Sequence, residues 1–249
     1  GSAERTSRVN ISLNGNVANS NSSQYNTKTH MICGGSYIMP STPEPKQQYG
    51  DVNITVKEKA FLANKNQNAV NIIGGGRSVG LNTHNFTLFG NVNIDIMSAD
   101  RDSEIYSVSG GGYIEGSENP GSSLVSGDIT ITSRRSAARI NGGGRVQGDW
   151  WKNGSMNACV SGDVTINLYK GNYTYIAGGG SMPELGSVIG NKQYEPAADA
   201  NVSGLAVINI HEGASPQYVV GGGFAAVPAL NCKADVEGSE INYIESGES

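Results

Sequence analysis

The chain has 249 residues, 35 of them glycine, and a formal net charge of −5 at pH 7. This glycine share is about twice the average of about 7%, while charged residues make up only 16% of the chain. A helical bundle is disfavoured, because each glycine inside a helix costs about 1 kcal/mol. The net negative charge and the lack of a run of basic residues argue against a nucleic-acid partner. No apolar stretch is long enough to insert into a membrane.

The cysteines and the first two residues indicate little chemistry. Cys33, Cys159 and Cys232 are odd in number and irregularly spaced, which predicts neither a disulfide framework nor a zinc site. We expect these cysteines to act as small apolar fillers, and we predict no metal and no cofactor. The opening Gly1-Ser2 is typical of an expression-tag remnant.

Two short motifs alternate along the chain, and successive copies of each begin 32 to 43 residues apart. The first motif is a glycine triplet, with Cys33-Gly34-Gly35 as a degenerate first copy and full copies at 74–76, 110–112, 142–144, 178–180 and 221–223. The second is a glycine, then Asp or Asn, then alternating apolar residues, at 50–56, 90–96, 127–132, 162–168 and, more loosely, 204–210. Residues 9–13 begin this second series, and residues 238–244 form a degenerate last copy.

Alignment of the second motif places aliphatic residues in three columns, which predicts strands with one buried face. The columns are Val9, Val52, Val92, Ile129, Val164, Ala206; then Ile11, Ile54, Ile94, Ile131, Ile166, Ile208; then Leu13, Val56, Ile96, Ser133, Leu168, Ile210. Two more columns lie two residues before each motif: Met31, Ile72, Val108, Ile140, Ile176, Val219 and Gln48, Leu88, Val125, Val160, Val202, Val236.

Each repeat therefore supplies three short apolar segments, and these segments can be buried only when successive repeats stack on one another. We predict an all-β fold: a right-handed parallel β-solenoid of about six coils with irregular inserted loops, as one domain over residues 1–249. Residues 14–30, rich in Asn and Ser, are a possible N-terminal cap. Glycine suits the corners, because it tolerates positive φ or close approach of a neighbouring coil. The following Asp or Asn is expected in a local Asx-turn, with a calcium-binding column as the alternative.

The stretch Val-Ser-Gly-Asp-Val-Thr-Ile-Asn-Leu at 160–168, with Tyr-Ile-Ala-Gly-Gly-Gly at 175–180, resembles a known repeat. It is similar to the Gly-Gly-Gly solenoid segments of large adhesin-like surface proteins from gut anaerobic bacteria. The resemblance covers nearly the whole chain and transfers no catalytic residues. It implies an extracellular or cell-surface location, excision from a larger protein with neighbouring domains, and contact with a host or plant glycan or a host surface protein.

Inserted loops of solenoids often form the binding edge, and three stretches qualify: 57–70, 145–159 and 181–201. The second stretch holds Asp149, Trp150 and Trp151, and the third holds Glu184 and Tyr194. Aromatic rings beside carboxylates suit sugars, because the ring covers the apolar sugar face while polar groups take the hydroxyls. Packing of the tryptophans over the solenoid is the alternative.

Two surfaces are further candidates. The position after the triplet reads Ser36, Arg77, Tyr113, Arg145, Ser181 and Phe224. Here Arg77 and Arg145 would flank Tyr113, either as a structural cation–π stack or as a binding site for anionic sugars. The outward face of the second-motif strands is an array of small polar residues, either an ice- or glycan-binding plane or an ordinary solvated surface with stacked asparagines.

The sequence favours a non-catalytic adhesion or carbohydrate-binding module. Glycoside hydrolysis needs two carboxylates about 5–10 Å apart, and nothing in the sequence fixes Glu115, Glu118 and Glu184 as such a pair. A polysaccharide lyase or glycosidase is the catalytic alternative, since β-helices also carry such enzymes. A ligand-free spacer is the third alternative, and the paired tryptophans argue against it.

Overall fold

The computed structural model describes residues 8–15, 30–38, 45–60, 70–80, 85–99, 105–116, 121–147, 155–182, 197–225 and 231–245. Across these ranges the regular elements are strands, they pair in parallel, and no helix occurs. Within the described ranges there is accordingly no helix of the length and apolarity that would cross a membrane. The predicted all-β parallel solenoid is confirmed.

The strands fall into four sheets that run along the solenoid, here numbered I to IV. Sheet I has seven strands, in spatial order β1 (Val9–Leu13), β5 (Val52–Val56), β9 (Val92–Ile96), β13 (Ile129–Ser133), β17 (Val164–Leu168), β21 (Val202–His211) and β25 (Val236–Ile244). Sheet II has six: β2 (His30–Cys33), β6 (Val70–Ile73), β10 (Ile105–Ser109), β14 (Ala137–Asn141), β18 (Gly171–Ala177) and β22 (Ala214–Val220).

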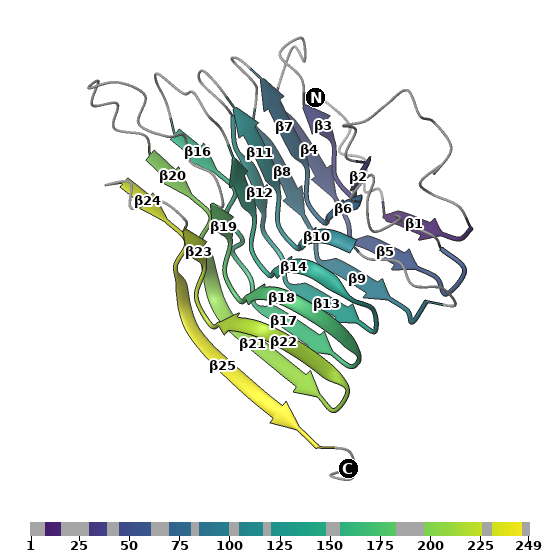
Figure 1. Ribbon diagram of the computed structural model, residues 1–249. Helices are drawn as coiled ribbons and strands as arrows, with labels where there is room; N and C mark the ends of the chain where they lie inside the picture. The colour runs from purple at the N-terminus through teal and green to yellow at the C-terminus, as the bar shows by residue number, and fades with distance from the viewer. Residues whose placement is uncertain are drawn as a thin grey trace, which may run out of the picture.

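The other two sheets have shorter strands. Sheet III has six: β3 (Tyr37–Ile38), β7 (Arg77–Gly80), β11 (Tyr113–Gly116), β15 (Arg145–Gln147), β19 (Ser181–Met182) and β23 (Phe224–Ala225). Sheet IV has two three-stranded parts: β4 (Lys46–Tyr49), β8 (Phe86–Phe89) and β12 (Ser123–Val125), then β16 (Ser155–Asn157), β20 (Ala197–Asp199) and β24 (Asn231–Lys233). Each coil visits the sheets in the order I, II, III, IV, so the chain makes six coils followed by β25 (Figure 1).

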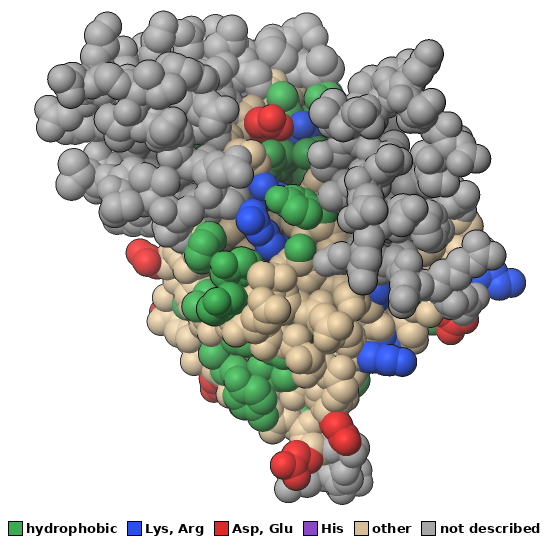
Figure 2. All heavy atoms as spheres, viewed as in Figure 1, with side chains coloured by type: hydrophobic (Ala, Val, Ile, Leu, Met, Phe, Trp, Pro, Cys, Tyr) green, Lys and Arg blue, Asp and Glu red, His purple; other side chains and the backbone are tan. Residues whose placement is uncertain are grey.

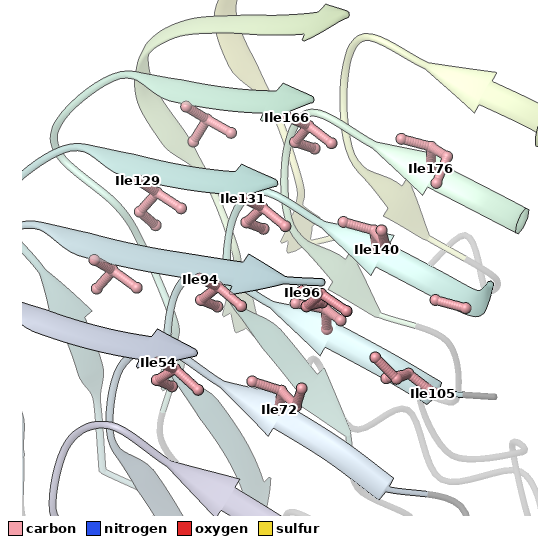
Figure 3. Close-up of a cluster of buried hydrophobic side chains, with 14 of the residues drawn as sticks. Ile54, Ile72, Ile94, Ile96, Ile105, Ile129, Ile131, Ile140, Ile166 and Ile176 are labelled. Atoms are coloured by element: carbon pink, nitrogen blue, oxygen red, sulfur yellow. The ribbon is translucent and has the colours of Figure 1, made fainter. Parts of the chain in front are cut away.

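The strand register confirms the three columns of sheet I. Ile54 pairs with Ile94, Ile94 with Ile131, and Ile131 with Ile166, and all four side chains are buried. Figure 3 shows these isoleucines stacked coil upon coil, opposite the isoleucines of sheet II. Burial of each such side chain contributes about 2 kcal/mol, so the stack supplies the main driving force for folding.

The first glycine copy was predicted one residue out of phase. Gly34 donates its backbone N–H to the Ile73 carbonyl, and Tyr37 pairs with Arg77, so the first copy is Gly34-Gly35-Ser36. Ile32, not Met31, therefore occupies the buried column with Ile72. Tyr37, not Ser36, occupies the position after the triplet. Cys33 was read as a substituted first glycine, whereas Ser36 replaces the third.

The sequence predicts three strand segments per coil, whereas the structure has four; sheet III is the one that the prediction lacks. The predicted loops 145–159 and 181–201 contain its strands β15 and β19, and sheet IV strands β16 and β20. A second, smaller core lies between sheets III and IV, formed by Ile114, Val146, Met156, Ala158 and Ala200. The cross-section therefore has two lobes, and the glycine triplets lie where the lobes meet.

The triplets are glycine because of close approach and not because of backbone handedness. Among the described residues the positive-φ glycines are Gly15, Gly50, Gly171 and Gly213, and no triplet glycine is one of them. A Cβ on Gly142 would collide with Val164 of the next coil, one on Gly143 with Gly180, and one on Gly144 with Ala158, the residue after β16. The backbone thus packs closely against its neighbours between the two lobes, and residues without a side chain suit most of these positions.

The Asp or Asn after the second-motif glycine does not form the predicted local turn. The Asp128 carboxylate accepts from the backbone N–H of Asp163 at 2.9 Å, and Asp163 accepts from Leu205 at 2.8 Å, so each side chain bonds the next coil. The stacked asparagines on the outward face of sheet I are confirmed: Asn93 donates to Asn53 and Asn53 to Asn10, each at 3.1 Å. No cluster of three or more metal-ligating side chains occurs in the described part.

Cys33 and Cys159 are free and half-buried. Burial raises the pKa of the Cys33 thiol to about 11, despite the opposing charge of Arg77. Because the thiolate is the reactive form, Cys33 is a poor nucleophile at neutral pH. This behaviour suits the apolar filler predicted for it.

Candidate functional site

A groove runs along the inward bend at the triplets, where the outer faces of sheets II and III meet. We call it the corner groove. Its sheet II wall is Asn71, Ser107, Arg139, Tyr175 and Tyr218, in register along the solenoid, and its sheet III wall is Tyr37, Arg77, Tyr113, Arg145, Ser181 and Phe224. The small glycine backbone brings the walls close: the Arg145 guanidinium donates across the groove to the Ser107 hydroxyl at 3.3 Å.

Long side chains fill the groove in the first four coils. The Arg77 guanidinium lies 5.1 Å from the ring centroid of Tyr37 and 5.5 Å from that of Tyr113, and Arg145 lies 5.3 Å from the Tyr113 centroid. The flanking of Tyr113 by two arginines, expected from the repeat alignment, is thus confirmed, with Tyr37 as a further member. Such contacts contribute about 1 kcal/mol each when partly buried.

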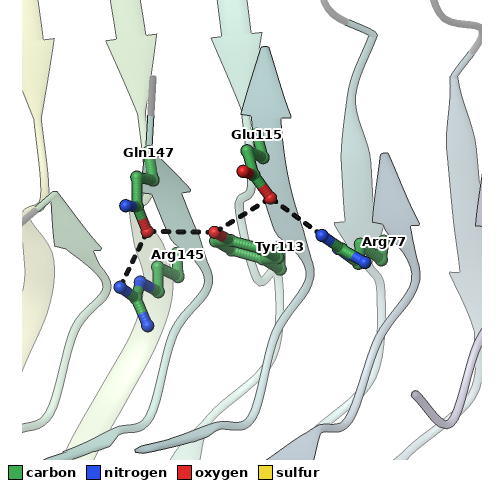
Figure 4. Close-up of polar contacts among 5 residues, drawn as sticks. All are labelled: Arg77, Tyr113, Glu115, Arg145 and Gln147. Carbon is green, nitrogen blue, oxygen red and sulfur yellow. Dashed lines mark hydrogen bonds and ion pairs between the residues drawn. The ribbon is translucent and has the colours of Figure 1, made fainter. Parts of the chain in front are cut away.

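Hydrogen bonds lock this stack, as Figure 4 shows for the strands β7, β11 and β15. Arg77 forms an ion pair with Glu115 at 2.8 Å, the Tyr113 hydroxyl donates to the Gln147 amide oxygen at 2.9 Å, and Arg145 donates to the same oxygen at 2.8 Å. Tyr113 is only 4% exposed and Arg145 only 8%. Burial raises the pKa of Tyr113 well above its usual value, although both arginines act to lower it. The stack is therefore rigid and largely closed to ligands.

The groove opens one coil after Arg145, towards the C-terminal end of the solenoid. The next residue in the column is Ser181, whose side chain is too short to reach across, and a hollow of about 130 Å³ lies there. Its walls are mainly apolar and include three aromatic side chains, Tyr175, Tyr218 and Phe224. The Tyr175 ring stacks on Tyr218 at 5.0 Å between centroids and meets Phe224 from the opposite wall at 5.3 Å. The hollow thus presents ring faces and edges to any occupant.

Basic and hydrophobic side chains meet at this part of the surface. Arg139 lines the hollow, 5.6 Å from the Tyr106 centroid and 6.0 Å from that of Tyr175. Tyr106 reaches this place because the register shifts at a bulge between Ile105 and Ser107. Figure 2 shows Lys and Arg side chains beside a group of hydrophobic ones on the face that carries β18, β22 and β23 in Figure 1.

The loop candidates Asp149, Trp150, Trp151, Glu184 and Tyr194 lie outside the described residues, as does Glu118. The same holds for residues 61–69 of the first predicted insertion. Of the predicted site residues, the structure brings together Arg77, Tyr113 and Arg145. Sequence reasoning missed the hollow itself, although the small Ser181 among large neighbours in the aligned column was a usable signal.

A second aromatic ladder lies away from the groove, at the turn between sheets I and II. Tyr169 stacks on His211 at 4.0 Å between centroids, and Arg134 lies 4.8 Å from the Tyr169 ring. Arg134 also forms an ion pair with Asp95 at 2.9 Å. The charge of Arg134 in this ladder is neutralised by Asp95, and the ladder residues do not line the hollow of the corner groove, so we treat the ladder as a structural contact and as a control surface.

Comparisons with known proteins provide no family assignment. No protein-family model, no curated protein and no solved structure matches the chain.

Proposed function

We propose that this solenoid is a non-catalytic carbohydrate-binding or adhesion module of an extracellular, cell-attached protein. The observation that supports the proposal is the hollow in the corner groove, walled by Tyr175, Tyr218 and Phe224. Aromatic faces cover the apolar faces of sugar rings, while neighbouring polar groups take hydroxyls. The open half of the groove also suits one residue of a polymer, whose neighbouring residues would extend beyond the hollow.

The size of the hollow fits one ring of such a polymer. At about 130 Å³ it is smaller than the roughly 300–1,000 Å³ of sites that enclose a drug-sized ligand. An engineered cavity of about 150 Å³ holds one benzene ring, so a single sugar ring is the matching scale. The resemblance to adhesin-like repeats, noted from the sequence, agrees with glycans of a host or of plant food as partners.

The groove gives less support to glycosidic cleavage. That reaction needs a pair of carboxylates. Among the described groove residues the carboxylate is Glu115, and it forms an ion pair with Arg77. A reducing-end assay over a polysaccharide panel separates the two functions: release of products by the purified domain would replace binding with catalysis.

Titration calorimetry against glycans selected on an array tests the proposal. We expect Phe224→Ala and Tyr218→Ala each to weaken binding about tenfold, since buried aromatic contacts dominate such interfaces. Tyr169→Ala is the matched control, because Tyr169 is a half-exposed ring on the other ladder. Binding of no glycan by the parent, or unchanged affinity in both groove variants, would overturn the proposal.

A further inference from the structure

Three buried polar groups at the hollow have no hydrogen-bond partner among the residues that the structure describes. They are Arg139 Nη1, Asn141 Nδ2 and Ser181 Oγ, and all three residues line the hollow. Asn141 and Ser181 are each only 3% exposed. An unsatisfied buried polar group costs about 1–3 kcal/mol, so folded proteins rarely leave three of them together. The cluster indicates that a ligand supplies the missing partner.

The chemistry of the three groups defines that partner. A guanidinium and an amide nitrogen can only donate hydrogen bonds, and a hydroxyl can donate as well. A group that satisfies all three at once must accept several hydrogen bonds and need not donate any. Ionised carboxylates and sulfates have this property, and they form the stronger, charge-assisted bonds with arginine.

The charge at the hollow also favours an anion. Within the described residues the ion pairs are Arg77 with Glu115 and Arg134 with Asp95, so Arg139 has no carboxylate partner there. Its described contacts are the rings of Tyr106 and Tyr175. A cation held between aromatic rings at the rim of an apolar hollow attracts an anion strongly, because water is partly excluded.

We propose that the hollow binds an acidic sugar: a pyranose ring carrying a carboxylate or a sulfate ester. The oxyanion lies on Arg139, Asn141 and Ser181, and the ring lies against Tyr175, Tyr218 and Phe224. This inference rests on the proposed carbohydrate-binding function and names its ligand class. It assigns specificity to the sheet II wall and the triplet corner, and affinity for the ring to the aromatic residues.

The test is titration calorimetry of the whole chain with four small probes: methyl β-D-glucuronide, glucose 6-sulfate, methyl β-D-glucoside and benzoate. We expect at least one of the two acidic sugars to bind at least tenfold more tightly than the neutral glucoside, and we identify the oxyanion by which of them does. Arg139→Gln should remove about tenfold or more of that preference. Arg134→Gln is the control, because Arg134 also stacks on a tyrosine but lies on the other ladder.

The outcomes separate this inference from the proposed function. Equal binding of the glucoside and the acidic sugars, lost in Phe224→Ala, would overturn the acidic-sugar inference and leave carbohydrate binding in place. Binding of benzoate but of no sugar would overturn both. An acidic preference that survives in Arg139→Gln, with the melting temperature unchanged, would also overturn the inference. Preference lost in Arg139→Gln and retained in Arg134→Gln supports it.

Discussion

The corner groove has a filled half and an open half, built on the same backbone. In the filled half Tyr37, Arg77, Tyr113 and Arg145 stack across four coils, and Tyr113 and Arg145 are buried there. In the open half the same register position holds Ser181 and then Phe224, and a hollow of about 130 Å³ results. The glycine triplets continue through both halves, so the scaffold sets the groove and one side chain per coil decides whether it is closed.

This difference explains why polar groups are treated differently in the two halves. In the filled half the Tyr113 hydroxyl and the Arg145 guanidinium share the Gln147 amide oxygen. Among the described residues, Arg77 Nε and Arg145 Nε lack partners in the filled half, whereas Arg139 Nη1, Asn141 Nδ2 and Ser181 Oγ lack partners around the hollow of the open half. The filled half therefore uses its long polar side chains to bond one another, whereas the open half leaves a hollow beside its polar groups.

The largest expected effect comes from the shared scaffold. Gly143→Ala places a Cβ against the backbone of Gly180 in the next coil, so we expect a loss of about 4 kcal/mol in the free energy of unfolding. Gly222→Ala is the matched control, because a Cβ there meets nothing within 4 Å. Guanidinium denaturation measures both, and similar losses in the two variants would contradict close approach as the reason for the triplets.

The next largest effect should come from truncating a stacked tyrosine, and the loss of stability should differ between the two halves. Tyr113→Ala removes a buried ring from the filled half and should cost about 3 kcal/mol. Tyr218→Ala, in the open half, removes a ring that is 56% exposed and should cost less than about 1 kcal/mol. Denaturation of both variants checks this order, and a reversed order would mean that the open half carries the stability.

Alkaline pH tests two buried tyrosines, Tyr113 in the filled half of the groove and Tyr173 in the hydrophobic core. Burial raises the pKa of Tyr173 to about 12 from 10, and burial also raises the pKa of Tyr113. The unfolded chain therefore releases these protons at a lower pH than the folded chain does. Stability should be fully present below pH 10 and should fall as the pH rises towards 12. Tyr173→Phe should flatten this slope in melting curves recorded against pH, and an unchanged slope would contradict it.

The smallest expected effect concerns the ion pair at the rim of the filled half. Glu115→Gln removes the partner of Arg77, but both side chains are partly exposed, so the cost should be below about 1 kcal/mol. The difference from the parent should shrink further in about 1 M salt, because ions screen exposed pairs. A cost of several kcal/mol would mean that this pair holds the stack together.

The sequence predicted the parts of the fold that repeat strictly. Sheet I follows from period-two aliphatic columns behind a Gly-Asp or Gly-Asn marker, and its register agrees residue by residue. Sheet III was missed because its strands have only two to four residues with mixed side chains, which give no periodic signal. The phase error at Cys33 arose because a serine, and not glycine, completes the first triplet.

The candidate site was predictable only where it repeats. The Arg77–Tyr113–Arg145 stack follows from aligning one position in three coils. The hollow depends on Arg139, Tyr175 and Phe224 meeting across the groove, and that meeting follows from the inward bend of the glycine triplets. The bend in turn comes from the two-lobed cross-section, which no single repeat reveals.

The central claim is that the opening at Ser181 makes the ligand site. Ser181→Tyr places a long side chain at the position that pairs with Arg145 in the next coil. This side chain extends the filled half of the groove into the hollow. Titration of this variant with methyl β-D-glucuronide and glucose 6-sulfate, beside the parent, tests the claim directly. We expect a folded variant, with the circular dichroism of the parent, that binds neither acidic sugar. Acidic-sugar affinity equal to the parent's in a folded Ser181→Tyr variant would contradict it.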